Sequence, residues 1–363
     1  MTDTIRVAVV HGGADPRLDG VADYVDHLVA ALPAVGVVAA AVPLRTVADT
    51  CRRVRRLAPD LVHVQFAPSA YGFRPAPCRL PLALGATPLV TTVHEYGWWA
   101  WPRWLPDRAW RMLERRGWWD RESGRLLPGG RGVAVTNPAH AALVRSRLGV
   151  SPRVIPLAPN VSRSGVAHSA DSGPVLVFFG YVHPVKGVRY LIEAVAMLVA
   201  RHPGLRLVVV GGFTSRALPE REARRFRDEL VACARRHGVA DRVELTGYLP
   251  AADASARLAA ADVGVLPFTD GVTTKSGALL TLFAHGLPTV ATRPGPDVRD
   301  LVHTVGQVRH AAALATAIDE VLSDRRLAAR LGSAGARFAA DRNWGRVAAA
   351  HRRWYAEVLG RSA

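Results

Sequence analysis

The sequence predicts an α/β protein built from two doubly wound domains. At 363 residues, the chain exceeds the size at which a single hydrophobic core usually stops growing. Short, continuously apolar runs alternate with helix-patterned segments in each half, as expected for parallel sheets covered on both faces. A polar stretch of small residues, VSRSGVAHSADSG (161–173), separates the two series and is the predicted linker.

The apolar runs of the N-terminal half, residues 1–160, are rich in β-branched residues and predict buried strands. These strands are IRVAVVH (5–11), VVAAAVP (37–43), DLVHVQF (60–66), PLVTTVHE (88–95) and GVAVTN (132–137). A glycine turn follows the first strand, and GVADYVDHLVAAL (20–32) then predicts a helix with one apolar face. That face consists of Val21, Tyr24, Val25, Leu28, Val29 and Leu32.

The same rhythm restarts in the C-terminal half, residues 174–342. Its predicted strands are PVLVFFGY (174–181), LRLVVVGG (205–212), RVELTGY (242–248), ADVGVLPF (261–268) and LPTVAT (287–292). The last stretch, 343–363, predicts a helix that crosses back toward the N-terminal domain. Two such sheets are expected to face a central cleft at the carboxyl ends of their strands, where open α/β sheets bind ligands.

Composition excludes several classes of protein. The three cysteines are far apart, so neither a disulfide framework nor a zinc site is predicted. The N-terminus lacks the pattern of a signal peptide, and no uncharged apolar run reaches membrane-spanning length. We therefore expect a cytoplasmic protein.

The net charge of +17 allows two interpretations. Arginines are spread over 52–56, 108–116, 221–229 and 324–330 with acids interleaved, as on solvated helix faces. The alternatives are an anionic membrane, with peripheral contact at its inner face, or a phosphorylated ligand. Nucleic acid is not an expected partner, because the charge is dispersed and no recognised motif is present.

Glycines recur at the predicted carboxyl ends of strands, where backbone amides can approach an anion. They are Gly12, Gly13, Gly180, Gly211, Gly212, Gly247 and Gly271. Lys186 stands six residues after Gly180 and opens a predicted helix. A cation at a helix N-terminus opposes the helix dipole, so a bound anion would explain it.

The segment DGVTTKSGALL (270–280) imitates the end of a Walker A loop without its glycines. Asp270 ends a strand, and an apolar helix follows Gly277. Thr273, Thr274, Lys275 and Ser276 lie between them and offer hydroxyls, an ammonium and backbone N–H groups that can hold a diphosphate. The alternative is that Thr and Ser only cap the helix.

His94 ends another predicted strand, and a segment dense in aromatic residues follows it. Glu95, Tyr96, Trp98 and Trp99 open this segment, which continues to residue 110, with two further tryptophans at 118 and 119. Indoles stack on sugars and also suit membrane interfaces, so a lid or an acceptor platform is one interpretation. A satellite core is the other.

Over nearly its whole length, the chain resembles the GT-B glycosyltransferases, specifically family 4 of the retaining nucleotide-sugar transferases. The segments that carry the resemblance are the Gly12–Gly13 loop, the strand-end His94, FFGYVHPVKGVRYLIEAV (178–195), VVVGG (208–212), VELTGYLP (243–250), ADVGVLPF (261–268) and AHGLPTVAT (284–292).

The resemblance implies a role for each matching position. Gly12 and Gly13 would approach the donor phosphates, and Lys186 would neutralise the diphosphate leaving group. Backbone near Gly212, Tyr248 and Leu249 would hold the nucleobase. His94 would contact the donor sugar or present its carbonyl to the anomeric centre, and the acceptor would bind the N-terminal domain.

The chain departs from the family pattern at two places. Tyr181 follows Gly180 where members usually carry arginine. Two family glutamates fall on Thr273 and Thr281, unless Asp270 takes the first place in a longer loop; both alignments remain open. We expect Lys275 to replace the missing arginine's charge, which gives His94, Lys186, Lys275 and Asp270 as the predicted catalytic residues.

The predicted activity is transfer of a sugar, with retention, from a UDP- or GDP-linked donor to an acceptor hydroxyl. No metal is expected, because no Asp-x-Asp motif follows a strand, and no cofactor is expected besides the nucleotide-sugar substrate. The acceptor would be a glycan, a lipid-linked sugar or a small natural product. The alternatives are a nucleotide-sugar epimerase and a nucleotide-sugar-binding protein without transfer activity.

Overall fold

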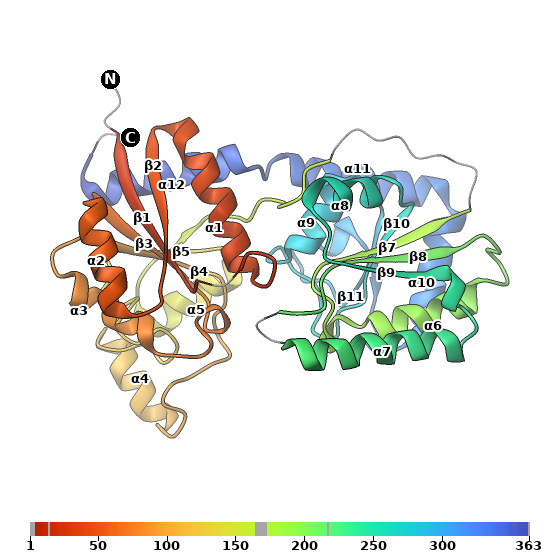
Figure 1. The fold of residues 1–363 in the computed structure, drawn as a ribbon, viewed down its shortest axis with the longest axis horizontal. Helices are drawn as coiled ribbons and strands as arrows, with labels where there is room; N and C mark the ends of the chain where they lie inside the picture. Colours follow the sequence, from red (N-terminus) through yellow and green to blue (C-terminus); the bar gives the residue numbers. More distant parts are fainter. Residues whose placement is uncertain (1–3, 14, 164–172, 216–217, 362–363) are drawn as a thin grey trace. The chain divides into compact units, whose positions relative to one another are not determined.

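The computed structural model describes residues 4–13, 15–163, 173–215 and 218–361. The chain forms two compact units: Met1–Leu157 with Trp344–Ala363, the N-terminal unit, and Ala158–Asn343, the C-terminal unit. Most of the predicted linker, residues 164–172, lies outside the described residues. The final helix, α12 (Trp344–Leu359), belongs to the N-terminal unit (Figure 1).

The N-terminal unit contains a six-stranded parallel sheet in the order β2-β1-β3-β4-β5-β6. Its strands are β1 (Ile5–His11), β2 (Val37–Pro43), β3 (Leu61–Phe66), β4 (Leu89–Val93), β5 (Gly132–Val135) and β6 (Arg153–Val154). Besides α12, its helices are α1 (Gly20–Ala31), α2 (Val47–Leu57), α3 (Leu80–Leu84), α4 (Asp107–Arg115) and α5 (Pro138–Leu148).

The C-terminal unit contains a second six-stranded parallel sheet, in the order β12-β11-β10-β7-β8-β9. Its strands are β7 (Val175–Phe179), β8 (Arg206–Val210), β9 (Val243–Gly247), β10 (Val263–Leu266), β11 (Thr289–Thr292) and β12 (His303–Val305). Its α-helices are α6 (Val188–Leu198), α7 (Glu220–Arg236), α8 (Ala251–Ala259), α9 (Gly277–Ala284), α10 (Ala311–Ser323) and α11 (Arg325–Ala340).

Short 3₁₀ helices join several of these elements. They are η1 (Leu32–Val35), η2 (Ser69–Tyr71), η3 (Ala76–Arg79), η5 (Pro184–Lys186), η6 (Ala240–Arg242) and η7 (Arg299–Leu301). The predicted fold class, two Rossmann-like domains, is confirmed. Every predicted strand is present, whereas the short edge strands β6 and β12 were not predicted.

The order of the strands locates the natural ligand sites. In each sheet the first strand along the chain lies in the interior, and later strands are added first on one side of it and then on the other. The direction of strand addition therefore reverses between β1 and β3 in the first sheet and between β7 and β10 in the second. Loops after the two strands at such a switch point diverge and leave room for a ligand. The residues after β7 and β10 are therefore the first place to examine in the C-terminal unit.

Local sequence sets the ends of several helices. The Asp19 carboxylate accepts hydrogen bonds from Val21 N and Ala22 N and caps α1, and Asn137 Oδ1 accepts from His140 N and caps α5. Gly149 ends α5 in the left-handed conformation. Among the described residues, no helix has the length and apolar character needed to cross a bilayer.

Candidate active site

Glycines close the switch point of the C-terminal unit. Gly180 follows β7 with φ +123°, and a β-carbon there would lie 3.4 Å from Ala278 Cβ at the start of α9. A β-carbon on Gly211, after β8, would collide with the carbonyl oxygen of Gly180. Only glycine lets these strand ends pack together. The loop after β7 is thereby placed against the first turn of α9.

Lys186 is fixed beside the end of β10. A side chain on Gly187 would collide with the carbonyl oxygen of Pro267, so η5 lies directly against the β10 loop. Thr269 strengthens this contact, because its N and Oγ1 both donate to the Val185 carbonyl, at 2.9 and 3.0 Å. The Lys186 ammonium lies 3.7 Å from the centre of the Phe268 ring, a cation–π contact.

Lys186 and Lys275 form a basic pair. Burial and the positive charge of Lys275 lower the pKa of Lys186 to about 8, while Asp270 opposes this shift. Lys275 and Asp270 are exposed, whereas Lys186 is half-buried. Two neighbouring cations repel each other, so an anion bound between them would relieve the repulsion. The charge of this pair is therefore compatible with a bound diphosphate.

The hydroxyls of the loop before α9 are largely engaged within the protein. Thr274 N and Oγ1 donate to Asp297 Oδ2 at 3.2 and 2.5 Å. Ser276 Oγ caps α9 by accepting from Leu279 N, and Ser276 N donates to the Thr273 carbonyl at 2.9 Å. The capping interpretation thus describes Ser276 in this structure. Gly277, the first residue of α9, has open space where a side chain would stand.

The remaining donor-side residues surround the ends of β7 to β9. Tyr181 is half-buried. A β-carbon added to Gly212 would lie 3.6 Å from Tyr248 Cβ, so these two residues are neighbours. The Tyr248 ring is 53% exposed and offers a flat surface for a base. Leu249 packs against the core, while Thr281 is fully buried in α9. Thr281 is therefore not placed to contact a ribose.

His94 stands directly after β4 and begins a buried polar network in the N-terminal unit. Its Nε2 lies 2.8 Å from Gln65 Oε1, which accepts a hydrogen bond from this nitrogen. The Gln65 amide nitrogen lies 3.0 Å from His63 Nε2. His63 also contacts Thr92 Oγ1 at 2.8 Å and, through Nδ1, Tyr355 Oη at 2.7 Å. The network thus connects His94 to α12.

The histidines of this network are neutral. Burial, with smaller contributions from His140 and His351, lowers the pKa of His94 to about 3, and burial also lowers the pKa of His63 well below its usual value. Because His94 Nε2 carries the proton that Gln65 accepts, Nδ1 of His94 is an acceptor. His94 can therefore accept a hydrogen bond from a sugar hydroxyl, but it does not supply a positive charge.

The Gly12–Gly13 loop, at the other switch point, is packed closely against the loop after β3. A β-carbon on Gly12 would collide with the carbonyl oxygen of Ala70. Gly13 has φ +73°, and its N donates to His11 Nδ1 at 3.4 Å. Burial lowers the pKa of His11. Internal packing alone thus requires glycine at position 12, and contact with donor phosphates stays a prediction.

The four residues predicted to face the acceptor differ in exposure. Trp98 is 59% exposed, and Glu95 is half-buried and accepts a hydrogen bond from Ser69 Oγ at 2.8 Å. Tyr96 and Trp99 are buried, at 5% and 8% exposed, and the Tyr96 hydroxyl donates to the Asp120 carboxylate. For these two residues, the satellite-core interpretation describes the structure better than the platform interpretation.

One cluster of metal-ligating side chains occurs among the described residues, away from the predicted site residues in sequence. Single donor atoms of Glu193, Cys233 and His237 lie within 4.8 Å of one another. The Glu193 carboxylate is paired with Arg189 Nε at 3.1 Å, and burial raises the pKa of the Cys233 thiol. Both conditions oppose cation binding.

Two family models match the chain. Residues 4–163 match the model described as Glycosyltransferase Family 4, and residues 173–324 match the model described as Glycosyl transferases group 1. The chain is a group 1 glycosyltransferase. The GT-B fold of this glycosyltransferase is also that of sucrose-phosphate synthase from Thermosynechococcus elongatus, with a TM-score of 0.71 at 20% identity over 98% of this chain and 99% of that one.

Curated relatives of this glycosyltransferase match it in part. A GDP-mannose-dependent α-(1-6)-phosphatidylinositol monomannoside mannosyltransferase from Mycolicibacterium smegmatis is 32% identical over 180 residues, 47% of this chain and 44% of the relative. A D-inositol 3-phosphate glycosyltransferase from Segniliparus rotundus is 28% identical over 172 residues, 47% of this chain and 32% of the relative. The glycosyltransferase thus spans less than half of either relative's length.

Several residues that build the site were not predicted. His63 and Gln65 are polar residues that alternate with valine in the buried strand β3. This polar pattern in a buried strand was the signal in the sequence that could have indicated them. No sequence pattern indicated Phe268 or Asp297. Phe268 contacts Lys186 and Asp297 contacts Thr274, and each contact joins residues that are distant in the sequence.

Proposed function

We propose that this glycosyltransferase takes its sugar from a nucleoside diphosphate donor held by the C-terminal unit. The observation that carries the proposal is the Lys186–Lys275 pair beside the switch point of β7 and β10. Departure of a nucleoside diphosphate builds negative charge, and cations already fixed at that position lower the barrier. Tyr248 would support the base, and Asp270 would bind sugar hydroxyls.

The proposed reaction retains the anomeric configuration. The acceptor hydroxyl attacks the face from which the diphosphate departs. The new C–O bond forms as the bond from the anomeric carbon to the phosphate oxygen breaks, and the departing phosphate takes the hydroxyl proton. His94, neutral and held by Gln65, would accept a hydrogen bond from a donor-sugar hydroxyl. The lysine pair supplies the charge that a metal would otherwise supply.

The acceptor is proposed to be a glycan, a lipid-linked sugar or a small natural product. The two curated relatives act on a phosphatidylinositol mannoside and on inositol 3-phosphate by name, which supports an acceptor rich in hydroxyls and linked to phosphate. A cytoplasmic location, with peripheral contact at the inner face of the membrane, is part of this proposal.

Thermal unfolding with UDP, GDP and other nucleoside diphosphates tests the donor site. A ligand at about 100 times its dissociation constant adds roughly 2.7 kcal/mol of stability. We expect one of the diphosphates to stabilise the wild type and to lose its effect in Lys186→Met. No stabilisation by any nucleoside diphosphate would contradict the proposal.

Incubation of the matching nucleotide sugar with an acceptor panel tests transfer. The anomeric configuration of the product distinguishes retention from inversion, and added EDTA tests metal independence. A rearranged sugar nucleotide formed from the donor alone would instead indicate an epimerase.

A further inference from the structure

An excursion of the N-terminal unit exposes an unusual combination of side chains. It runs from Trp101 to Arg125 and includes α4, which projects from the unit in Figure 1. Four large apolar side chains on it are strongly exposed: Trp101 at 41%, Trp104 at 80%, Met112 at 45% and Trp118 at 56%. Exposed tryptophan is costly in water but stable at the boundary between lipid headgroups and acyl chains.

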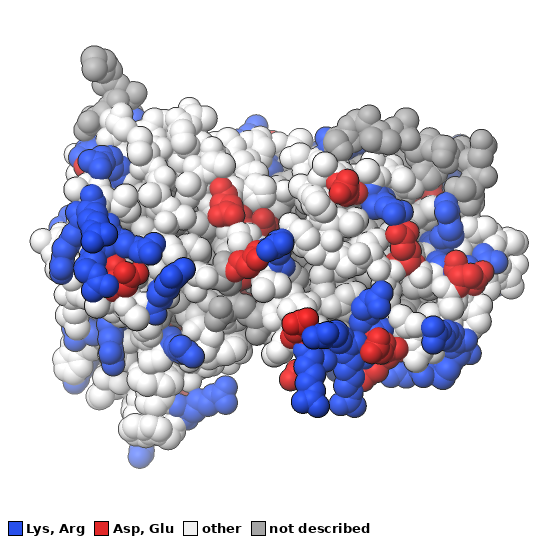
Figure 2. Space-filling view, viewed as in Figure 1, with Lys and Arg blue, Asp and Glu red and all other residues white. Residues whose placement is uncertain are grey.

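Arginines surround these apolar side chains. Those exposed on the excursion are Arg103, Arg108, Arg111, Arg115, Arg116 and Arg125. Its acids are largely withdrawn from the surface, since Glu114, Asp120 and Glu122 are buried at 1%, 0% and 3% exposed. Asp107 is exposed and paired with Arg121. Figure 2 shows basic side chains spread over the lower part of the N-terminal unit, where Figure 1 places α4.

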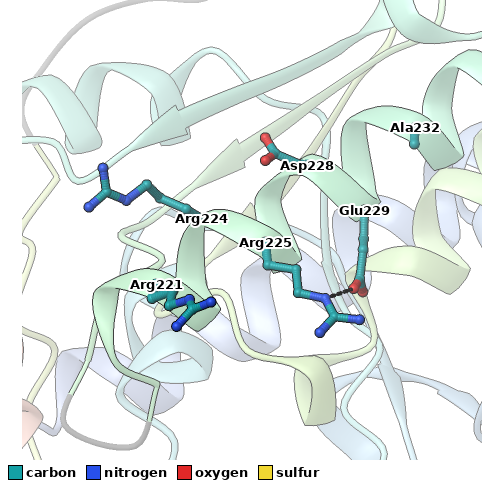
Figure 3. Close-up of a pocket in the computed structure, with 6 residues that line it drawn as sticks. All are labelled: Arg221, Arg224, Arg225, Asp228, Glu229 and Ala232. Carbon is teal, nitrogen blue, oxygen red and sulfur yellow. Dashed lines mark hydrogen bonds and ion pairs between the residues drawn. The ribbon is translucent and has the colours of Figure 1, made fainter.

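The exposed arginines of the excursion are not paired with carboxylates of the described residues. Within the described residues, none of the six forms a salt bridge, and Arg116 instead lies over the Trp118 ring at 4.9 Å. Helix α7 provides the contrast, because there Arg224 pairs with Glu220 at 2.9 Å and Arg225 pairs with Glu229 at 3.2 Å. Figure 3 shows the second of these pairs. Arg224 and Arg225 are thus paired with carboxylates within α7, whereas the six arginines of the excursion have no carboxylate partner among the described residues.

An open apolar groove completes the excursion. It is lined by Pro102, Leu105, Trp110, Leu113, Trp118, Trp119 and Arg125. A groove of indole and aliphatic surface with an arginine among its lining residues suits a lipid, whose acyl region is apolar and whose phosphate is anionic. A soluble anionic partner would use the arginines but would not bury the tryptophans.

We propose that the surface formed by residues 101–125 docks onto an anionic bilayer, with Trp104 and Trp118 at the headgroup boundary and the arginines on lipid phosphates. This inference extends the proposed location at the membrane and names the surface responsible. Binding to vesicles is measured without any sugar donor. Failure of the docking proposal therefore leaves the transfer reaction standing, and the converse also holds.

Co-sedimentation with phosphatidylglycerol-containing vesicles, compared with pure phosphatidylcholine vesicles, tests the proposal. The wild type is expected to bind the anionic vesicles preferentially, with a blue shift of tryptophan emission. A basic residue near an anionic surface contributes about fivefold in affinity, so the triple variant Arg108→Gln, Arg111→Gln, Arg115→Gln should bind about a hundredfold more weakly.

The matched control makes the same change in charge elsewhere. Arg221→Gln, Arg224→Gln and Arg225→Gln on α7 should leave vesicle binding unchanged. Trp104→Ala should weaken binding and reduce the blue shift, while Leu82→Ala, at an exposed apolar residue outside the excursion, should not. Circular dichroism checks that each variant is folded.

Three results would overturn the proposal. They are equal wild-type binding to both kinds of vesicle, an equal loss of binding in the α4 and α7 triple variants, and unchanged binding in both the α4 triple variant and Trp104→Ala.

Discussion

The predicted catalytic residues that follow the strands are neutral and hydrogen-bonded in the N-terminal unit, whereas in the C-terminal unit they include two neighbouring lysines. In the N-terminal unit, His94 is held in a buried chain of neutral hydrogen-bonding groups that reaches Tyr355 on the last helix. In the C-terminal unit, two lysines lie near each other beside one acid. A neutral network stabilises one geometry, whereas a repelling pair of cations is stabilised by an external anion. In the proposed function, the first unit would position the sugar and the second would neutralise the charge of the leaving group.

The largest expected effect comes from removing the more buried cation. Lys186→Met should lower kcat/KM by about a hundredfold or more, the scale found when one preorganised group that stabilises the transition state is lost. Steady-state kinetics with the identified donor measures it. Lys186→Arg, which keeps the charge, should retain more activity than Lys186→Met. Equal activity of Lys186→Met and the wild type would contradict the proposal that the C-terminal unit neutralises the charge of the leaving group through Lys186.

Acid should destabilise the N-terminal unit through its buried histidines. Burial lowers the pKa of His351 to about 4, and its Nδ1 donates to the Val347 carbonyl at 2.9 Å. The unfolded chain takes up a proton at about pH 6.5 and the folded chain does not, so stability falls as the pH drops from there toward 4. This residue alone should cost roughly 2 kcal/mol between about pH 7.5 and pH 5.

Denaturant unfolding of His351→Leu at both pH values isolates that contribution. The variant should lose less stability on acidification than the wild type, and His237→Leu, at an exposed histidine of the C-terminal unit, should behave like the wild type. An unchanged pH dependence in His351→Leu would show that the buried histidine is protonated in the folded state.

The exposed cation should matter less than the buried one. Lys275→Met should reduce turnover at least about tenfold, because a charge open to solvent is better screened, although in the proposed site it would still face the leaving group. Lys275→Arg should restore most of the activity if charge alone is needed. Comparison of initial rates for the three proteins measures this, and unchanged turnover in Lys275→Met would refute the proposed replacement of the family arginine.

The smallest effect concerns the pH dependence of diphosphate binding. The pKa of Lys186 is lowered to about 8, so this lysine loses its charge as the pH rises through that value. Affinity for UDP or GDP should fall by up to about tenfold between about pH 7 and pH 9. Calorimetric titration measures it. Lys186→Arg should show a flatter profile, and an equally steep profile in that variant would place the titrating group elsewhere.

The sequence by itself determined the fold class and the positions of most strands. Buried parallel strands are continuous apolar runs, and amphipathic helices have a periodic apolar pattern. Both are local properties, so they can be recognised in the sequence alone. It also marked Lys186, Lys275 and the glycines. The edge strands β6 and β12, with two and three residues, are too short to show any periodicity.

Only the tertiary structure decided which marked residues are available to a ligand. It buried Tyr96 and Thr281, engaged Thr274 with Asp297, and placed Phe268 beneath the Lys186 ammonium. It also connected His94 through Gln65 and His63 to Tyr355 of α12, which is 292 residues after His63 in the sequence. Burial and hydrogen-bond pairing arise from contacts between distant segments, and a local pattern does not encode such contacts.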